Sequence, residues 1–69
     1  MKYKRIIDLR EEKDWTQTEV AKKLNVSQRA YSHYENGTRQ IPLEILISLA
    51  KLYSVSTDYI LGLTDKKKS

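Results

Sequence analysis

The sequence contains no cysteine, one proline and two glycines among its 69 residues. The absence of cysteine excludes a disulfide framework and a thiolate zinc site. A single histidine, His33, without any cysteine makes a poor metal site, so we predict neither a metal nor another cofactor. The sequence also has no glycine-rich phosphate loop and places no nucleophile beside His33, so we do not expect an enzyme.

Long apolar runs are absent as well. No stretch approaches the ~20 apolar residues needed to span a bilayer, and the N-terminal MKYKRIIDLREE is not a secretory signal. We therefore expect a cytoplasmic protein with no membrane partner and no small-molecule ligand. A chain of this length predicts one domain, which we place at residues 1–65, followed by a basic, disordered tail at 66–69.

The charge is basic but modest. The net charge of +4 suggests a polyanionic partner. The terminal DKKKS (65–69) supplies three lysines and one aspartate, or +2, and the remainder keeps 10 basic and 8 acidic residues, also +2. The composition therefore permits nucleic-acid binding without requiring it. Whether the chain binds nucleic acid depends on where the charged side chains lie.

Helical periodicity recurs along the chain and strand alternation is absent, which predicts an all-α fold. Five helices are expected: about Tyr3 to Lys13, from Thr16, from Ser27 to the ENG ending at Gly37, from Pro42, and from Ser56 to Gly62. TQTE at 16–19 is a capping box. The fourth helix is apolar around most of its surface, so we expect much of it to be buried.

The third predicted helix has two different faces. Ala30, Tyr31 and Tyr34 share an apolar face, so we predict that the two tyrosines belong to the core. The opposite face is polar and consists of Gln28, Arg29, Ser32 and His33. Glutamine pairs with adenine and arginine with guanine in the major groove, although many solvated helix faces have a similar composition.

The spacing of the second and third helices favours a function for this polar face. An eight-residue helix, a three-residue turn and another helix are the proportions of a helix-turn-helix. In that unit the second helix enters the major groove. Gln17, in the first turn of the preceding helix, would then face a phosphate. Asn36, Thr38 and Arg39 would contact phosphates beyond the other end.

Residues 15–39, WTQTEVAKKLNVSQRAYSHYENGTR, resemble the helix-turn-helix of the phage repressor and Cro family, also called the Xre family. VSTDYILGLTD at 55–65 resembles the last helix of that five-helix domain, so the resemblance spans about residues 3–65. It implies a compact lambda-repressor-like fold and a transcription regulator that binds specific sequences of double-stranded DNA. The chain departs from many members in one respect, because Arg39 stands three residues before Pro42 instead of two.

The resemblance also implies roles for individual residues. Base contacts fall to Gln28, Arg29 and His33, with Ser32 beside them, and phosphate contacts fall to Gln17, Ser27 and Asn36. Arg10 and Glu35 match an ion pair that joins the first helix to the end of the third. The alternative for Glu35 is plain solvent exposure.

Members of this family usually bind DNA as two-fold dimers on inverted repeats. Tyr59, Ile60, Leu61 and Leu63 are more apolar residues than one short terminal helix can bury, so we expect the interface within this domain. We assign Tyr59 and Leu63 to it and Ile60 to the core; the alternative is that all four residues cover the core. The expected function is repression by occlusion in the bacterial nucleoid, with activation left open. A protein-interaction module and the antitoxin of a toxin–antitoxin pair are the alternatives.

Overall fold

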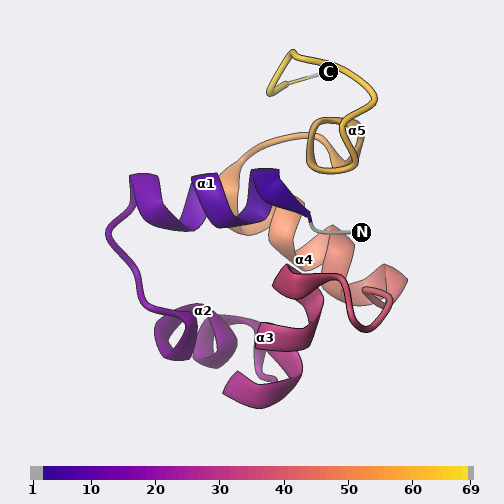
Figure 1. The fold of residues 1–69 in the computed structure, drawn as a ribbon. Coiled ribbons are helices and arrows are strands. Elements are labelled where there is room, and N and C mark those ends of the chain that lie inside the picture. The colour runs from indigo at the N-terminus through magenta and orange to yellow at the C-terminus, as the bar shows by residue number, and fades with distance from the viewer. Residues whose placement is uncertain (1–2, 69) are drawn as a thin grey trace.

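A computed structural model describes residues 3–68, which form an all-α domain without strands in that range. The helices are α1 (Lys4–Glu12), α2 (Gln17–Leu24), α3 (Gln28–Asn36), α4 (Leu43–Tyr53) and α5 (Thr57–Ile60). In Figure 1, α2 and α3 lie at the bottom, α1 crosses above them, and α5 with the C-terminal segment lies at the top. The predicted fold class and number of helices are confirmed for the described residues.

The helices begin where the sequence supplies capping side chains. Thr16 Oγ1 accepts a hydrogen bond from the Glu19 backbone N–H at 3.1 Å, and the Glu19 carboxylate accepts one from the Thr16 N–H at 3.3 Å. Ser27 and Ser56 cap α3 and α5 in the same way. Each cap satisfies a backbone donor that the helix itself leaves unpaired.

The helix ends agree less closely with the sequence prediction. Gly37 follows α3 in the left-handed conformation at φ 73°, as the ENG pattern predicts. The fifth helix ends at Ile60, two residues before the predicted stop. Leu61 keeps a right-handed conformation, and Gly62 is the first residue after α5 that has a positive φ.

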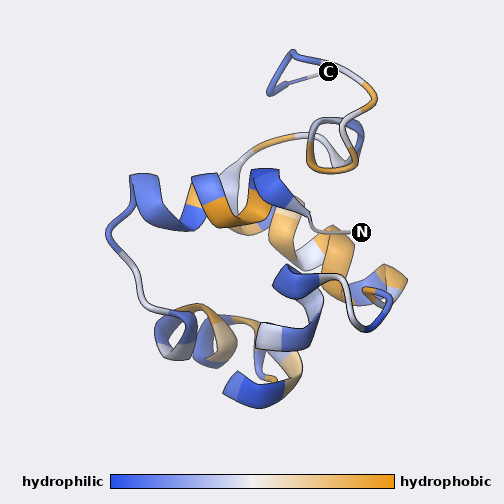
Figure 2. Cartoon of the chain, viewed as in Figure 1, coloured by the Kyte–Doolittle hydropathy of each residue, from blue (hydrophilic) through white to orange (hydrophobic). Residues whose placement is uncertain are grey.

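The core lies where the inner faces of the helices meet, and Figure 2 shows α4 coloured mostly as hydrophobic. Buried apolar residues come from every helix: Ile6, Leu9, Val20, Ala21, Leu24, Tyr31, Tyr34, Leu49, Ala50, Tyr53 and Ile60. The predicted core positions of Tyr31, Tyr34 and Ile60 are therefore confirmed. Trp15 packs at the edge, with its ring centroid 5.8 Å from that of Tyr53.

The expectation that α4 is buried over most of its surface is wrong for its first turns. Leu43 is 70% exposed and Ile47 is 41% exposed. The main contacts of α4 with other helices are made by α2 and α5, and they cover only part of its surface. The apolar side chains that they leave uncovered form a surface, not a core.

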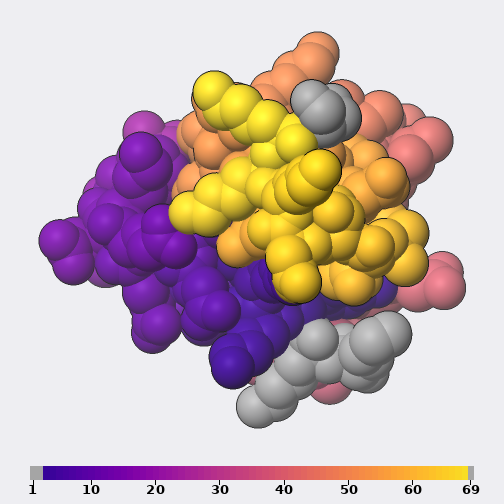
Figure 3. All heavy atoms as spheres, turned by 90° about the horizontal axis from the view of Figure 1, so that it is seen from above, coloured from indigo at the N-terminus to yellow at the C-terminus, as the bar shows by residue number. Residues whose placement is uncertain are grey.

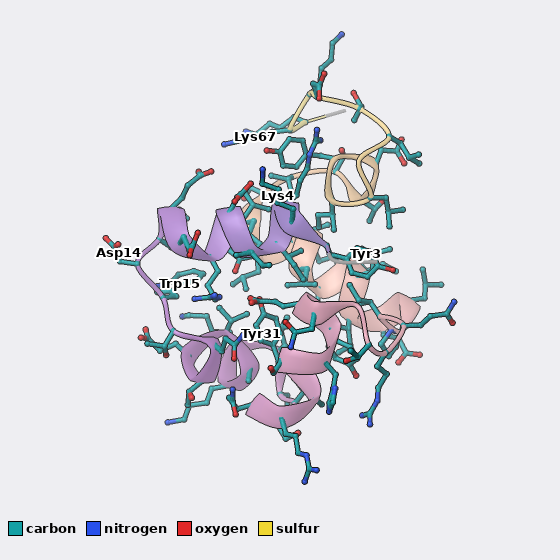
Figure 4. All side chains as sticks on the ribbon, viewed as in Figure 1. Tyr3, Lys4, Asp14, Trp15, Tyr31 and Lys67 are labelled. Carbon is teal, nitrogen blue, oxygen red and sulfur yellow. The ribbon has the colours of Figure 1, made fainter. Side chains whose placement is uncertain are left out.

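The segment after α5 folds back on α1 (Figure 3). The Arg5 guanidinium donates to the backbone oxygens of Tyr59 and Thr64, and it pairs with Asp65 at 2.8 Å. The Lys67 carbonyl accepts from the Ser56 N–H at 2.6 Å. The Lys67 ammonium, labelled in Figure 4, lies 3.4 Å from the Glu12 carboxylate. Disorder of 66–69 remains an expectation, and Ser69 lies outside the described residues.

No helix between residues 3 and 68 combines the length and the apolar character that crossing a membrane requires.

Candidate nucleic-acid interface

The α2–α3 unit is held at a defined angle by its turn. Asn25 ends α2 in the left-handed conformation at φ 60°. The Val26 N–H donates to the Ala21 carbonyl at 2.9 Å, and Ser27 then begins α3. Ala21 is 2% exposed, and its small side chain allows the two helices to pack closely. The predicted helix-turn-helix geometry is therefore present.

The structure separates the two faces of α3 as the sequence predicts. Tyr31 is fully buried and Tyr34 nearly so, and Figure 4 places Tyr31 in the interior between α1 and the α2–α3 pair. Gln28 and Arg29 are exposed, whereas Ser32 and His33 are half-buried on the same side of the helix. The polar face points away from the core and toward solvent, so a ligand can reach it.

The structure brings Arg10 and Glu35 together across α1 and α3. Arg10 Nε donates to Glu35 Oε2 at 2.7 Å, and Nη2 donates to Oε1 at 3.3 Å. The Glu35 side chain is only 2% exposed. The only acidic residue of α3 is thus neutralised in the interior, and its charge does not face the polar surface.

This environment shifts the ionisation of Glu35 and its neighbours. Burial alone would raise the pKa of Glu35, but the hydrogen bonds from Arg10 and Gln17 outweigh it and hold the pKa below its ordinary value. Burial raises the pKa of Tyr31 far above its ordinary value and that of Tyr53 to about 12. Both tyrosine hydroxyls are buried without a hydrogen-bond partner among the described residues.

Gln17 links this buried pair to the exposed face. Its amide nitrogen donates to Glu35 Oε1 at 3.0 Å, and its amide oxygen accepts from Gln28 Nε2 at 2.8 Å. Gln17 is half-buried and is the first residue of α2. Its side-chain amide therefore lies beside the backbone N–H groups at the N-terminus of this helix. The two hydrogen bonds thus connect Gln28 to the buried ion pair.

The remaining predicted phosphate-contacting residues flank α3. Ser27 Oγ accepts from the Ala30 N–H at 3.1 Å, which leaves its own hydroxyl proton for another acceptor. Asn36 is exposed in the last turn of α3, and Arg39 is exposed in the loop before α4. Thr38 lies 2.7 Å from the His33 ring, a contact that we did not predict. The signal for this contact in the sequence is Gly37, because its left-handed conformation turns the chain back toward α3.

The two residues assigned to a dimer interface have different environments. Leu63 is 74% exposed. Tyr59 is half-buried, and the Arg5 guanidinium lies 4.3 Å from its ring centroid. Three further apolar side chains are exposed that the sequence analysis did not assign to the interface: Leu43, Ile47 and Leu61. Among residues 3–68, no cluster of three or more histidine, cysteine or acidic side chains is placed to hold a metal.

Residues 6–60 match the family model described as helix-turn-helix, a range that contains all the predicted DNA-contacting residues. The chain belongs to the Xre-type helix-turn-helix family. Relatives of the chain are named as HTH-type transcriptional regulators.

Three curated relatives of this Xre-type chain illustrate the family. The uncharacterized HTH-type transcriptional regulator YobD of Bacillus subtilis (strain 168) is 43% identical over 61 residues, which cover 88% of this chain and 54% of YobD. The HTH-type transcriptional regulator ImmR of the same strain is 40% identical, with 94% and 51% covered. The cryptic phage CTXphi transcriptional repressor RstR of Vibrio cholerae is 45% identical, with 74% and 46% covered. The chain thus spans about half the length of these relatives.

Proposed function

We propose that this Xre-type domain represses transcription by binding an inverted-repeat operator as a homodimer, with α3 of each copy in the major groove. Gln28, Arg29, Ser32 and His33 would contact base edges there. Gln17, Ser27, Asn36 and Arg39 would contact phosphates on either side. A dimer seated on a promoter would exclude other proteins from the same DNA.

The observation that carries this proposal is the division of charge on α3. Arg29 is exposed, whereas Glu35 is buried and paired with Arg10. An exposed carboxylate at the end of α3 would repel the DNA phosphates, and the ion pair removes that repulsion. The face consequently presents amide, hydroxyl, imidazole and guanidinium groups without a free negative charge.

The same face argues against a protein partner. Interfaces between proteins usually centre on aromatic or large apolar side chains. The large side chains of α3, Tyr31 and Tyr34, are buried and unavailable. Gln28 and Arg29, which are exposed, are the residue types most suited to bases.

The exposed apolar side chains support a dimer beside this face. Leu43 and Ile47 are one helical turn apart on α4, and Leu61 and Leu63 follow α5. In Figure 1 the start of α4 lies at the right of the molecule, and the chain after α5 lies at the top. A two-fold contact through these side chains would let both copies of α3 face the same DNA. Leu63 is therefore kept in the proposed interface, and Leu43, Ile47 and Leu61 are added to it.

The test is affinity selection from a random duplex library at ~150 mM salt, a concentration at which non-specific phosphate binding is weakened. We expect an enriched inverted repeat with half-site centres about one helical turn, ~34 Å, apart. Enrichment of a single half-site would contradict the dimer. Failure of the folded protein to enrich any sequence would contradict the proposed function and favour a protein partner, such as a toxin.

A further inference from the structure

The C-terminal segment, residues 61–67, follows α5 and lies over α1 (Figure 3). It contains neither helix nor strand, and its two leucines are not buried. Leu61 is 43% exposed and Leu63 is 74% exposed. Burial of apolar surface therefore contributes little to holding this segment in place.

Polar contacts of Arg5, in the first turn of α1, hold the segment instead. Arg5 Nη1 donates to the backbone oxygens of Tyr59, at 3.0 Å, and of Thr64, and Nη2 donates to the Asp65 carboxylate at 2.8 Å. The guanidinium also lies 4.3 Å from the centroid of the Tyr59 ring. One planar group thus joins α1 to the chain on both sides of the exposed leucines.

The contacts of Arg5 with the backbone matter more than its ion pair. Asp65 is 98% exposed, and an ion pair with so exposed a partner stabilises little. The Arg5 side chain is only 26% exposed, and its hydrogen bonds to the two carbonyl oxygens are partly buried. Hydrogen bonds from a charged donor are stronger than those between neutral groups. We therefore expect the two carbonyls to anchor the segment.

Further backbone hydrogen bonds hold the segment at other points. The Leu63 N–H donates to the Asp58 carbonyl at 2.9 Å, and the Lys67 carbonyl accepts from the Ser56 N–H at 2.6 Å. Gly62 adopts a positive φ of 79°, which makes the turn between the two leucines possible. The backbone of the segment is thus fixed while the side chains of Leu61 and Leu63 stay exposed.

We propose that Arg5 is a positioning residue for the dimer interface, because it holds the C-terminal segment so that Leu61 and Leu63 meet a second copy of the chain. This inference rests on the proposed function. A segment that becomes ordered only on association loses its conformational entropy at that moment, which weakens the complex. A segment already fixed by Arg5 in the free chain avoids that loss.

The pairing of Asp65 suits contact with a second copy. In a two-fold interface, residues near the axis lie close to the same residues of the partner. An unpaired carboxylate two positions after Leu63 would repel its counterpart in the other copy. The Arg5 guanidinium neutralises Asp65 and reduces that repulsion. It also covers one face of the Tyr59 ring, so that face is not available to a partner.

The first experiment measures amide hydrogen exchange by NMR in the DNA-free chain. Arg5→Met removes the donors but keeps an apolar side chain, and Lys4→Met removes a positive charge from the adjacent exposed position as a control. We expect Arg5→Met to accelerate exchange of the Ser56 and Leu63 N–H groups by about tenfold or more, the effect of losing hydrogen bonds to a charged group. The Val26 N–H, in the turn between α2 and α3, should be unaffected.

Two results of this measurement would overturn the inference. Unchanged exchange at Ser56 and Leu63 in Arg5→Met would mean that Arg5 does not hold the segment. Equal acceleration at Val26 would mean that Arg5 stabilises the whole fold rather than this segment. Lys4→Met should match the wild type at all three amides.

The second experiment compares binding to the selected inverted repeat and to its single half-site. We expect Arg5→Met to weaken binding to the inverted repeat by about tenfold, because each copy must then order its segment on association. Affinity for the half-site should stay unchanged. Arg5→Lys keeps the charge but replaces the planar guanidinium by an ammonium, so it should recover only part of the affinity. Lys4→Met should bind both DNAs as the wild type does.

The outcomes separate this inference from the proposed function. If Arg5→Met bound the inverted repeat as tightly as the wild type, the inference would be wrong and the proposed function would stand. Equal weakening on both DNAs would also overturn it, since Arg5 would then act through the fold or through direct contact with DNA. Failure of the wild type to select an inverted repeat would overturn both.

Discussion

Arg29 is the only arginine or lysine in α3, and it is exposed near the start of the helix. If it contacts a base, Arg29→Ala should cost about 1–3 kcal/mol on the selected operator and relax the preference at one base pair. Titrations of operator and random duplexes would measure both effects. Lys66→Ala is the matched control, because it removes one positive charge from the segment that lies above α1, away from α3. Equal weakening of operator and random DNA by Arg29→Ala would make Arg29 a phosphate contact.

Glu35 links a single side chain to the stability of the fold. The pKa of Glu35 is lowered in the folded state, so its ionised carboxylate stabilises the fold. This contribution to the free energy of unfolding is fully present above the ordinary pKa of 4.5, and it is lost as the pH falls through the folded-state pKa. We expect the free energy of unfolding of the wild type to decrease with acid below about pH 4.5. Urea denaturation at several pH values measures it.

Glu35→Gln tests the origin of that dependence. Removal of the charge should lower the free energy of unfolding at neutral pH by about 1.5–3 kcal/mol, the usual range for a hydrogen bond to a charged group. It should also flatten the acid dependence. Glu11→Gln makes the same change at an exposed position of α1 and should leave the profile unchanged. An equally steep profile in Glu35→Gln would mean that other carboxylates cause the acid loss.

At the scale of elements, α2 depends on its N-terminal capping box. Thr16→Ala removes the oxygen that accepts from the Glu19 N–H, and it should lower the free energy of unfolding by about 1 kcal/mol. Thr16→Ser keeps the oxygen and should lose much less. Urea denaturation of the three proteins is the measurement. If Thr16→Ala were as stable as the wild type, the capping hydrogen bond would not stabilise the fold, because water would satisfy the Glu19 N–H equally well.

The elements also show where the patterns of the sequence mislead. The α2 start and the α3 end were predictable because the signals are local: TQTE at 16–19 and the Asn-Gly pair at 36–37. The exposure of Leu43 and Ile47 was not predictable, because the apolar residues of α4 do not reveal how many neighbouring elements cover that helix. In a short domain, few elements are available to do so.

At the scale of the whole molecule, the proposed dimer interface contains the exposed leucines Leu43 and Leu63. Leu63→Glu and Leu43→Glu each place a charge in the proposed interface and should weaken binding to an inverted repeat by about tenfold or more, equivalent to at least ~1.4 kcal/mol. Affinity for a single half-site should stay unchanged, and this is the internal control for a direct effect of charge on DNA. Gel shift titrations on full and half sites distinguish the two. Equal losses on both DNAs would remove these leucines from the interface.

The sequence by itself determined the all-α class, the helix-turn-helix, its caps and the polar face of α3, because each depends on residues only a few positions apart. It also indicated the Arg10–Glu35 pair, through a resemblance to a family. The tertiary structure decided the rest: the bonds of Gln17 to Glu35 and Gln28, the contact of Thr38 with His33, and the uncovered side of α4. These features depend on distances and angles between side chains brought together by folding, and a linear pattern does not contain them.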